Sequence, residues 1–318
     1  MLRQSTPTTP CSLSRIRGTD RLARTVSRSG IRFAGTGGSS GAVHDLSGCV
    51  LESHLEGTGG AVRGAPVKSA SPPRVNNDIY HDLGERWYNA QDDPVALLRA
   101  ESRLRNPWIA KELRARFAGR ALRILDVGCG GGFLSNYLAA QGHAVVGLDF
   151  AADALKVARL HDISGRAAYI AADAYRLPFP DGSFDAVCSM DFLEHVEQPE
   201  CAIREASRLL TPGGLFIFHT FSRNWLAWLV VIKGVEWFVR NAPPHMHVLR
   251  LFIKPEDLVS MCVRSGLAVD YLRGIAPAVF SAEFWKLLMR RTVPNSFAFR
   301  FTRSPRISYS GIARKSHR

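Results

Sequence analysis

A glycine-rich loop between an apolar strand and a helix constrains the fold of this chain more than any other feature. The segment Ile124-Leu-Asp-Val-Gly-Cys-Gly-Gly-Gly-Phe133 follows a predicted strand over 122–127 and opens a predicted helix over 133–141. Consecutive glycines let a ligand approach the backbone, and a helix N-terminus offers unpaired N–H groups. The next predicted strand ends beside Asp149, 23 residues after Asp126. At that spacing an acid can accept both ribose hydroxyls, so the combination predicts a site for an adenosyl ligand.

Strands and helices alternate regularly beyond residue 76. This order predicts an α/β fold with a seven-stranded, mostly parallel sheet, helices on both faces and a final antiparallel strand. No apolar run approaches the roughly 20 residues that span a bilayer. The predicted strands cover 122–127, 143–148, 167–171, 184–189, 215–220, 268–272 and 306–313.

The two ends of the chain are basic. Residues 1–75 carry a net charge of +6 and are rich in Ser, Thr, Gly and Arg, which predicts disorder. That extension is either a mitochondrial transit peptide or sequence upstream of the true start, and 76–318 form the folded domain. Residues 285–318 carry +9 with interleaved aromatics. This pattern suits an anionic membrane surface, or only a solvated edge strand and tail, and the near-neutral body argues against a nucleic-acid binder.

Several motifs resemble those of class I methyltransferases, which use S-adenosylmethionine. The glycine loop with Asp149 looks like motif I and the second-strand acid of that class, and Asp173 looks like its adenine-side acid. The segments Leu177-Pro-Phe-Pro-Asp-Gly-Ser-Phe-Asp185 and Leu210-Thr-Pro-Gly-Gly214 are typical of the same class. The resemblance implies a Rossmann-like fold with S-adenosylmethionine as cofactor.

A narrower resemblance is to the ubiquinone-biosynthesis O-methyltransferases, and it runs from about residue 80 to 313. Family-like segments in the expected order carry it: Arg86-Trp-Tyr88, Leu155-Lys-Val-Ala-Arg-Leu-His161, Met190-Asp-Phe-Leu-Glu-His-Val196, Phe221-Ser-Arg-Asn224, Gly234-Val-Glu-Trp237 and Phe252-Ile-Lys-Pro255. The chain departs from the family at Gly274-Ile-Ala-Pro-Ala-Val-Phe280, which lacks the family's Tyr-Asn pair. The cofactor is therefore better specified than the acceptor.

The resemblance also implies the residues that bind the cofactor. In the family an upstream arginine, the first loop glycine, the second-strand acid and a methionine contact S-adenosylmethionine. The full predicted cofactor set is Arg105, Asp126, Gly128, Gly130, Asp149, Asp173 and Met190.

The residues after the fourth strand predict the chemistry of the reaction. If the chain turns helical there, Asp191, Glu194 and His195 share one face. Two carboxylates and an imidazole can then hold a divalent cation, and the family resemblance implies Mg²⁺ bound to a catechol oxygen. Alternatively, His195 is a general base oriented by Glu194. A third interpretation is a simple helix start capped by Asp191.

An apolar insert at about 221–250 carries three tryptophans between Trp225 and Trp237. Tryptophan at a boundary between apolar and wet phases is typical of membrane interfaces, so we expect a peripheral membrane contact. A roof over the active site or an oligomer contact is the alternative.

The expected function is O-methylation of a polyprenylated catechol or demethylubiquinol. Alternatives are another lipophilic or small phenolic acceptor, or a non-catalytic membrane adaptor that binds an adenosyl ligand. The expected location is the cytoplasmic face of a bacterial inner membrane, or the matrix side of the mitochondrial inner membrane. Other ubiquinone-biosynthesis enzymes are the expected protein partners.

Overall fold

The computed structural model describes residues 75–316. The prediction of a disordered or targeting extension over 1–75 therefore lies, except for Val75, outside the described residues. Within the described part of the chain, no helix is long and apolar enough to cross a membrane.

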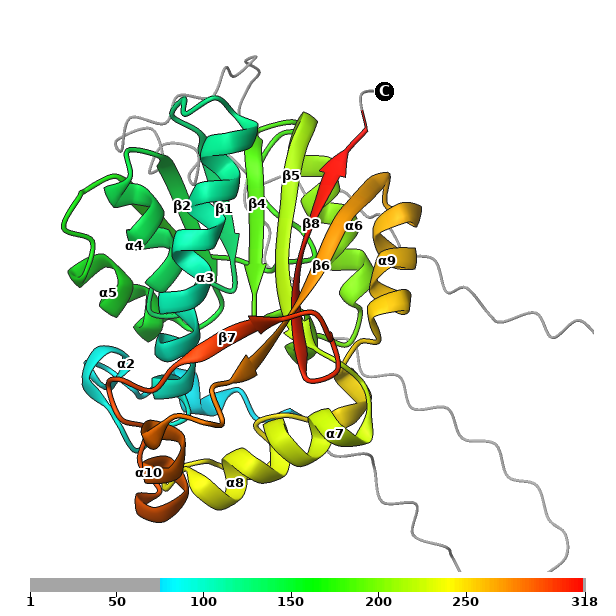
Figure 1. The fold of residues 1–318 in the computed structure, drawn as a ribbon. Coiled ribbons are helices and arrows are strands. Elements are labelled where there is room, and N and C mark those ends of the chain that lie inside the picture. Colours follow the sequence, from blue (N-terminus) through cyan, green and yellow to red (C-terminus); the bar gives the residue numbers. More distant parts are fainter. Residues whose placement is uncertain (1–74, 317–318) are drawn as a thin grey trace, which may run out of the picture.

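One eight-stranded sheet forms the centre of the molecule, in the order β3-β2-β1-β4-β5-β8-β6-β7 (Figure 1). The neighbours from β3 to β5 pair in parallel, and β8 pairs antiparallel with both β5 and β6. The α/β fold and the antiparallel final strand are confirmed. The strands are β1 (Arg123–Val127), β2 (Ala144–Asp149), β3 (Ala167–Ala171), β4 (Phe184–Met190), β5 (Leu210–Phe221), β6 (Leu267–Pro277), β7 (Phe299–Thr302) and β8 (Ser308–Lys315).

The predicted count of seven strands is wrong because of β7. This strand is only four residues long and pairs antiparallel with the last residues of β6, from Gly274 to Pro277. Its alternating aromatic and basic residues resembled a solvated tail. The pairing with β6 depends on a contact across more than 20 residues of sequence, which local pattern does not reveal.

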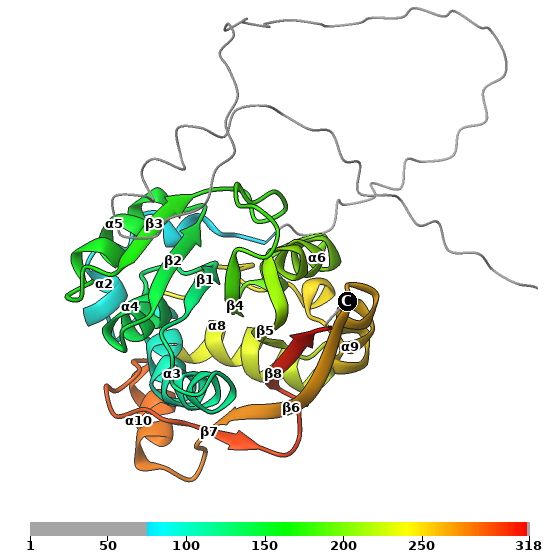
Figure 2. The same cartoon turned by 90° about the horizontal axis from the view of Figure 1, so that it is seen from above.

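Helices cover both faces of the sheet (Figure 2). On one face, apolar side chains of α3 and α4 pack on β1, β4 and β5, and on the other face α6 and α9 close the core. The helices are η1 (Asp78–Tyr80), α2 (Arg86–Asn89), α3 (Val95–Arg116), α4 (Phe133–Ala140), α5 (Ala152–Leu160), η2 (Leu193–His195), α6 (Pro199–Leu209), α7 (Trp225–Ala227), η3 (Trp228–Lys233), α8 (Gly234–Phe238), η4 (Leu249–Leu251), α9 (Pro255–Arg264) and α10 (Ala282–Arg290).

The predicted insert lies beyond the carboxyl ends of the parallel strands. There α7, the π-helical turn η3 and α8 follow one another at the bottom of Figure 1, beside α10. The Asn224 side chain starts α7 by accepting a hydrogen bond from the Ala227 N–H at 3.0 Å. In an α/β fold, ligands bind at this end of the strands, so the insert lies where it can close a site.

Candidate active site

The glycine loop turns sharply at the end of β1 and is tied to β2. The N–H groups of Gly128 and Cys129 donate to the Leu148 carbonyl at 2.8 and 2.9 Å. Gly128 has φ +73°, and a Cβ atom there would lie 2.8 Å from Phe192. Gly130 has φ +49°, and its Cβ would lie 2.6 Å from Trp87. Both positions therefore require glycine for backbone conformation and for close aromatic contact.

Asp149 ends β2 and faces the loop. Its Oδ2 accepts a hydrogen bond from the Gly130 N–H, and its Oδ1 accepts one from the Ala151 N–H, both at 2.8 Å. Burial raises the pKa of this carboxyl, and the backbone N–H donors oppose that effect. The carboxylate is thus fixed in orientation, and each oxygen keeps a lone pair for a ligand hydroxyl.

A cavity of about 470 Å³ opens over this loop, and we call it the polar cavity. Several aromatic side chains that were not among the predicted cofactor residues also line it, including Tyr80, Trp87 and Phe150. The Arg86-Trp-Tyr88 segment was the one sequence signal for this wall. Of the predicted cofactor residues, the following line the polar cavity: Arg105, Gly128, Gly130, Asp149, Asp173 and Met190.

Asp126 lies beneath the loop and is not among the residues that line this cavity. Its Oδ2 accepts a hydrogen bond from the Ser135 hydroxyl at 2.6 Å, which ties the end of β1 to α4. Burial raises the pKa of Asp126 to about 6. Asp126 therefore holds the loop, and its predicted contact with the cofactor has no support in this geometry.

The chain after β4 is not helical at Asp191. That residue has φ +54°, and only the single 3₁₀ turn η2 follows, from Leu193 to His195. The Asp191 carboxylate accepts two hydrogen bonds from the Arg105 guanidinium, at 2.9 and 2.5 Å. Glu194 instead accepts a hydrogen bond from the Thr220 hydroxyl at 2.8 Å and is fully buried. The assumption that Asp191 belongs to the same helical face is wrong.

This geometry does not fit the predicted metal site of Asp191, Glu194 and His195. Asp191 is already paired with the permanent cation Arg105, and Glu194, whose pKa is raised well above its usual range by burial, is held by the Thr220 hydroxyl. Across residues 75–316, the acids and histidines that converge within 4.8 Å are instead Glu101, Asp191 and His219. The Arg105 guanidinium lies beside these three residues, 3.7 Å from a Glu101 carboxyl oxygen.

His195 lines the polar cavity, and its hydrogen bond to Asn77 leaves one ring nitrogen unprotonated. Its Nδ1 donates to the Asn77 side-chain oxygen at 3.0 Å, which leaves the lone pair on Nε2. Burial lowers the pKa of His195 to about 4, partly offset by the negative charge of Asp191. The imidazole is therefore neutral at pH 7 and can accept a proton.

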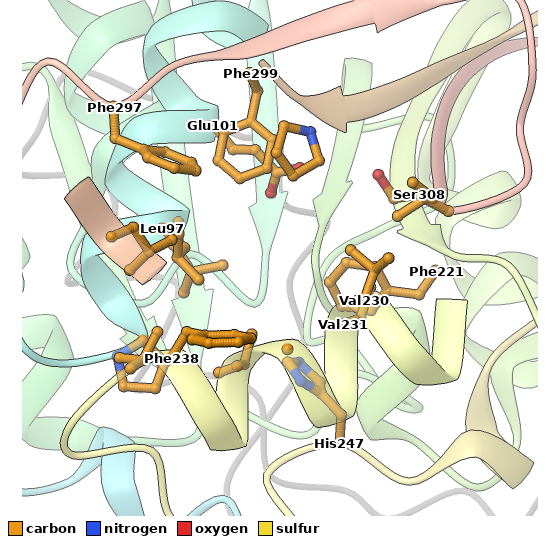
Figure 3. Close-up of a pocket in the computed structure, with 18 of the residues that line it drawn as sticks. Leu97, Glu101, Phe221, Val230, Val231, Phe238, His247, Phe297, Phe299 and Ser308 are labelled. Atoms are coloured by element: carbon orange, nitrogen blue, oxygen red, sulfur yellow. The ribbon is translucent and has the colours of Figure 1, made fainter. Parts of the chain in front are cut away.

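A second cavity, of about 400 Å³, adjoins the first and is almost wholly apolar; we call it the apolar cavity. Its walls come from the insert, α3, α10, β6 and β7, and Tyr80 and Leu98 line both cavities. The insert therefore roofs a cavity, as one of the two predicted roles requires. Figure 3 shows Leu97, Phe297 and Phe299 on one side of the apolar cavity and Phe221, Val230 and Val231 on another.

Known proteins match this chain in sequence and in fold. A methyltransferase domain family matches residues 125–218. The ubiquinone biosynthesis O-methyltransferase of Bordetella avium is 37% identical over 217 residues, covering 66% of this chain and 88% of that protein. Its counterpart in Thiobacillus denitrificans is 37% identical, covering 62% and 84%.

A solved structure supports the fold alone. Magnesium protoporphyrin IX methyltransferase from Synechocystis PCC 6803, with bound SAH, has a TM-score of 0.52 and 19% identity over 75% of this chain and 97% of that one. The sequence similarity, the matching domain and the glycine-loop geometry agree. This chain therefore belongs to the ubiquinone biosynthesis O-methyltransferase family, whose members are class I methyltransferases that use S-adenosylmethionine.

Proposed function

We propose that this protein transfers a methyl group from S-adenosylmethionine to a phenolic oxygen of a polyprenylated catechol such as demethylubiquinol. The observation that carries this proposal is the contact between two unlike cavities. The polar cavity suits an adenosyl ligand, and the apolar cavity suits a prenyl tail. Because they share Tyr80 and Leu98, the head of a lipid can meet the methyl group at their boundary.

The cofactor side of the reaction needs orientation more than activation. The sulfonium already carries a good leaving group, so the protein must hold the methyl carbon in line with the attacking oxygen. Asp149 would accept the ribose hydroxyls, and the glycine loop would lie close to the amino-acid part of the cofactor. Arg105 and Asp191 would lie on the side of the acceptor, because Arg105 is 3.7 Å from Glu101, which lines the apolar cavity.

His195 would act as the general base. Its Nε2 would take the phenolic proton while the oxygen forms a bond to the methyl carbon and the carbon–sulfur bond breaks. The products are the methyl ether, S-adenosylhomocysteine and an imidazolium that later loses its proton to water. Asn77 would hold the ring in the basic tautomer.

The direct test incubates the full chain with methyl-labelled S-adenosylmethionine and a short-chain demethylubiquinol. We expect label in the ether oxygen's methyl group and no label with the dimethoxy product as acceptor. Label in a carbon-bound methyl group, or no label in any phenol, would overturn the proposal.

We further propose that the insert and α10 dock on a membrane surface, which is where a polyprenyl substrate resides. Large aromatic side chains on these elements are exposed beside the roof of the apolar cavity. Trp225 is 73% exposed, Trp237 54% and Trp285 57%. Basic residues of α10 and its end, Lys286, Arg290 and Arg291, would add attraction to anionic lipid.

Liposome co-sedimentation tests this membrane contact. The double variant Trp225→Asp/Trp228→Asp should lose binding to anionic vesicles and keep its affinity for S-adenosylmethionine. The matched control is Ile163→Asp, which changes a 95% exposed apolar residue in the loop after α5. Equal sedimentation of the double variant and the parent would show that the insert is only a roof or an oligomer contact.

A further inference from the structure

One carboxyl side chain lines the apolar cavity. Glu101 of α3 is the only carboxyl group among the described residues that line it, and its own exposure is 4%. Figure 3 shows it on the wall formed with Phe299, facing the same space as His247 and Ser308. A carboxyl group in an apolar wall costs free energy unless it pairs with something polar, so its presence needs an explanation.

His219 of β5 lies next to Glu101 and lacks a partner on one side. The ring is fully buried, and its Nδ1 lies 2.9 Å from the Ser310 hydroxyl. Its Nε2 has no hydrogen-bond partner and lies 3.7 Å from the nearer Glu101 oxygen and 3.5 Å from an Asp191 oxygen. Those separations are too long for hydrogen bonds.

Glu101 lines the apolar cavity and Asp191 lines the polar one, and His219, which lines neither, lies buried beside both carboxyl groups. Arg105 binds Asp191 on the polar side, and its guanidinium also lies 3.7 Å from Glu101. Glu101 in turn reaches the apolar cavity, and Arg105 and Asp191 reach the polar one. An acceptor ring at the boundary would therefore place one oxygen toward the cofactor and a neighbouring oxygen toward Glu101.

We propose that Glu101 and His219 bind the hydroxyl next to the one that is methylated, and so make the enzyme select a vicinal diol ring. This inference rests on the proposed function and names the feature of the acceptor that is recognised. A hydroxyl both donates and accepts, so it can bond Glu101 and satisfy His219 Nε2 together. A ring without that hydroxyl leaves buried polar groups unpaired, which is the strongest way for a site to reject a ligand.

The competing explanation is that Glu101 and His219 only stabilise the Arg105–Asp191 pair. If the role is structural, substituting either residue should weaken the binding of every ligand alike. If the role is recognition, the substitution should weaken the binding only of ligands that carry the second hydroxyl. The test must therefore compare two acceptors on the same variant.

The experiment measures equilibrium binding of a short-chain prenyl catechol and of the matching monophenol to the full chain saturated with S-adenosylhomocysteine. We expect the parent to prefer the catechol at least tenfold. Glu101→Leu and His219→Phe should reduce that preference to about twofold or less, with monophenol affinity and S-adenosylhomocysteine affinity unchanged. The matched control is Glu112→Leu, on the same helix but paired with Arg116.

Each outcome decides the inference. A parent that binds both rings equally, or a Glu101→Leu variant that keeps the tenfold preference while still binding S-adenosylhomocysteine, overturns it. If Glu101→Leu fails to bind S-adenosylhomocysteine, Glu101→Met replaces it as a longer side chain without a hydrogen-bonding oxygen, and an undiminished preference there has the same meaning. Because binding is measured without turnover, a catechol preference without methyl transfer would refute the proposed function and leave this inference standing.

Discussion

The polar and apolar cavities are built in opposite ways. The polar cavity is built around the ends of β1, β2 and β4, where the loop glycines and the Asp149 carboxylate lie beside aromatic and polar side chains. The apolar cavity is made of side chains from the insert, α3, α10, β6 and β7, which lie far apart in the sequence. The polar cavity is therefore a feature of the general fold. The apolar cavity is specific to the version of that fold in this chain. Their boundary is where the chemistry must occur.

The largest effect should come from a residue at that boundary. His195→Ala should lower kcat by about 10²–10⁴-fold, the usual contribution of a general base, with little change in the affinity for S-adenosylmethionine. Part of the rate should return as the pH approaches the pKa of the catechol, because the substrate then ionises unaided. Single-turnover rates between pH 6 and 10 measure both effects. A kcat within fivefold of the parent would remove His195 from the reaction.

The next effect should be confined to the polar cavity. Asp149→Ala should weaken S-adenosylmethionine binding by about 1.5–3 kcal/mol, or roughly 10–150-fold, because hydrogen bonds to a charged group are lost. Calorimetry on the full chain measures this loss, and acceptor affinity should stay unchanged. Asp153→Ala is the control, since that acid lies nearby in the first turn of α5 and pairs with Lys156. Similar losses in both variants would contradict a ribose contact.

Acceptor binding in the apolar cavity should depend on the length of the prenyl tail. Each methylene that leaves water contributes about 0.8 kcal/mol, so the first prenyl unit should tighten acceptor binding by at least about tenfold. The gain should stop once the tail extends beyond the cavity. A series of acceptors with zero to four prenyl units tests this on the parent protein. Affinity that is independent of tail length would show that the tail binds elsewhere.

Glu101 should also affect the pH dependence of stability, which can be measured separately from ligand recognition. Its folded pKa is about 8 because of burial, above its usual value of 4.5, so the folded state holds an extra proton between those values. The free energy of unfolding should therefore fall as pH rises from about 5 to 8. Glu101→Gln should reduce this fall by about 1 kcal/mol or more, measured by urea unfolding at both pH values. An unchanged pH dependence would mean that Glu101 is ionised in the folded protein.

The smallest effect should come from chelation. Because Arg105 already pairs with Asp191 and Glu194 is bound to Thr220, exhaustive treatment with EDTA should leave turnover within about twofold. Adding Mg²⁺ back measures any remaining dependence. Loss of activity that Mg²⁺ restores would show that the side chains rearrange around an ion in the working enzyme.

Sequence pattern predicted the polar cavity well because its information is local. The glycine loop and Asp149 each end or follow a strand, and parallel strands bring their carboxyl ends together. Asp173 and Met190 also follow or end a strand, but only the family resemblance indicated that they bind the cofactor. The order of strands β1 to β5 follows from the same alternation of strands and helices. Arg105 required the family resemblance, since nothing in its helical surroundings points to a ligand.

The remainder could not be predicted because it depends on pairing across the chain. β7 exists only through its contact with β6, and the apolar cavity needs the insert to fold back over both. Glu101 and His219 are 118 residues apart and meet only in the folded sheet. The positive φ of Asp191 broke the helical spacing on which the metal prediction depended.

Tyr80 and Leu98 have a thermodynamic consequence as the wall that both cavities share. If the first ligand to bind restricts these side chains, the second ligand would find them already ordered. By linkage, the factor by which S-adenosylmethionine tightens acceptor binding must equal the factor by which the acceptor tightens S-adenosylmethionine binding. Because S-adenosylhomocysteine would occupy the same cavity, its retention after each turnover would also depend on how much acceptor is available.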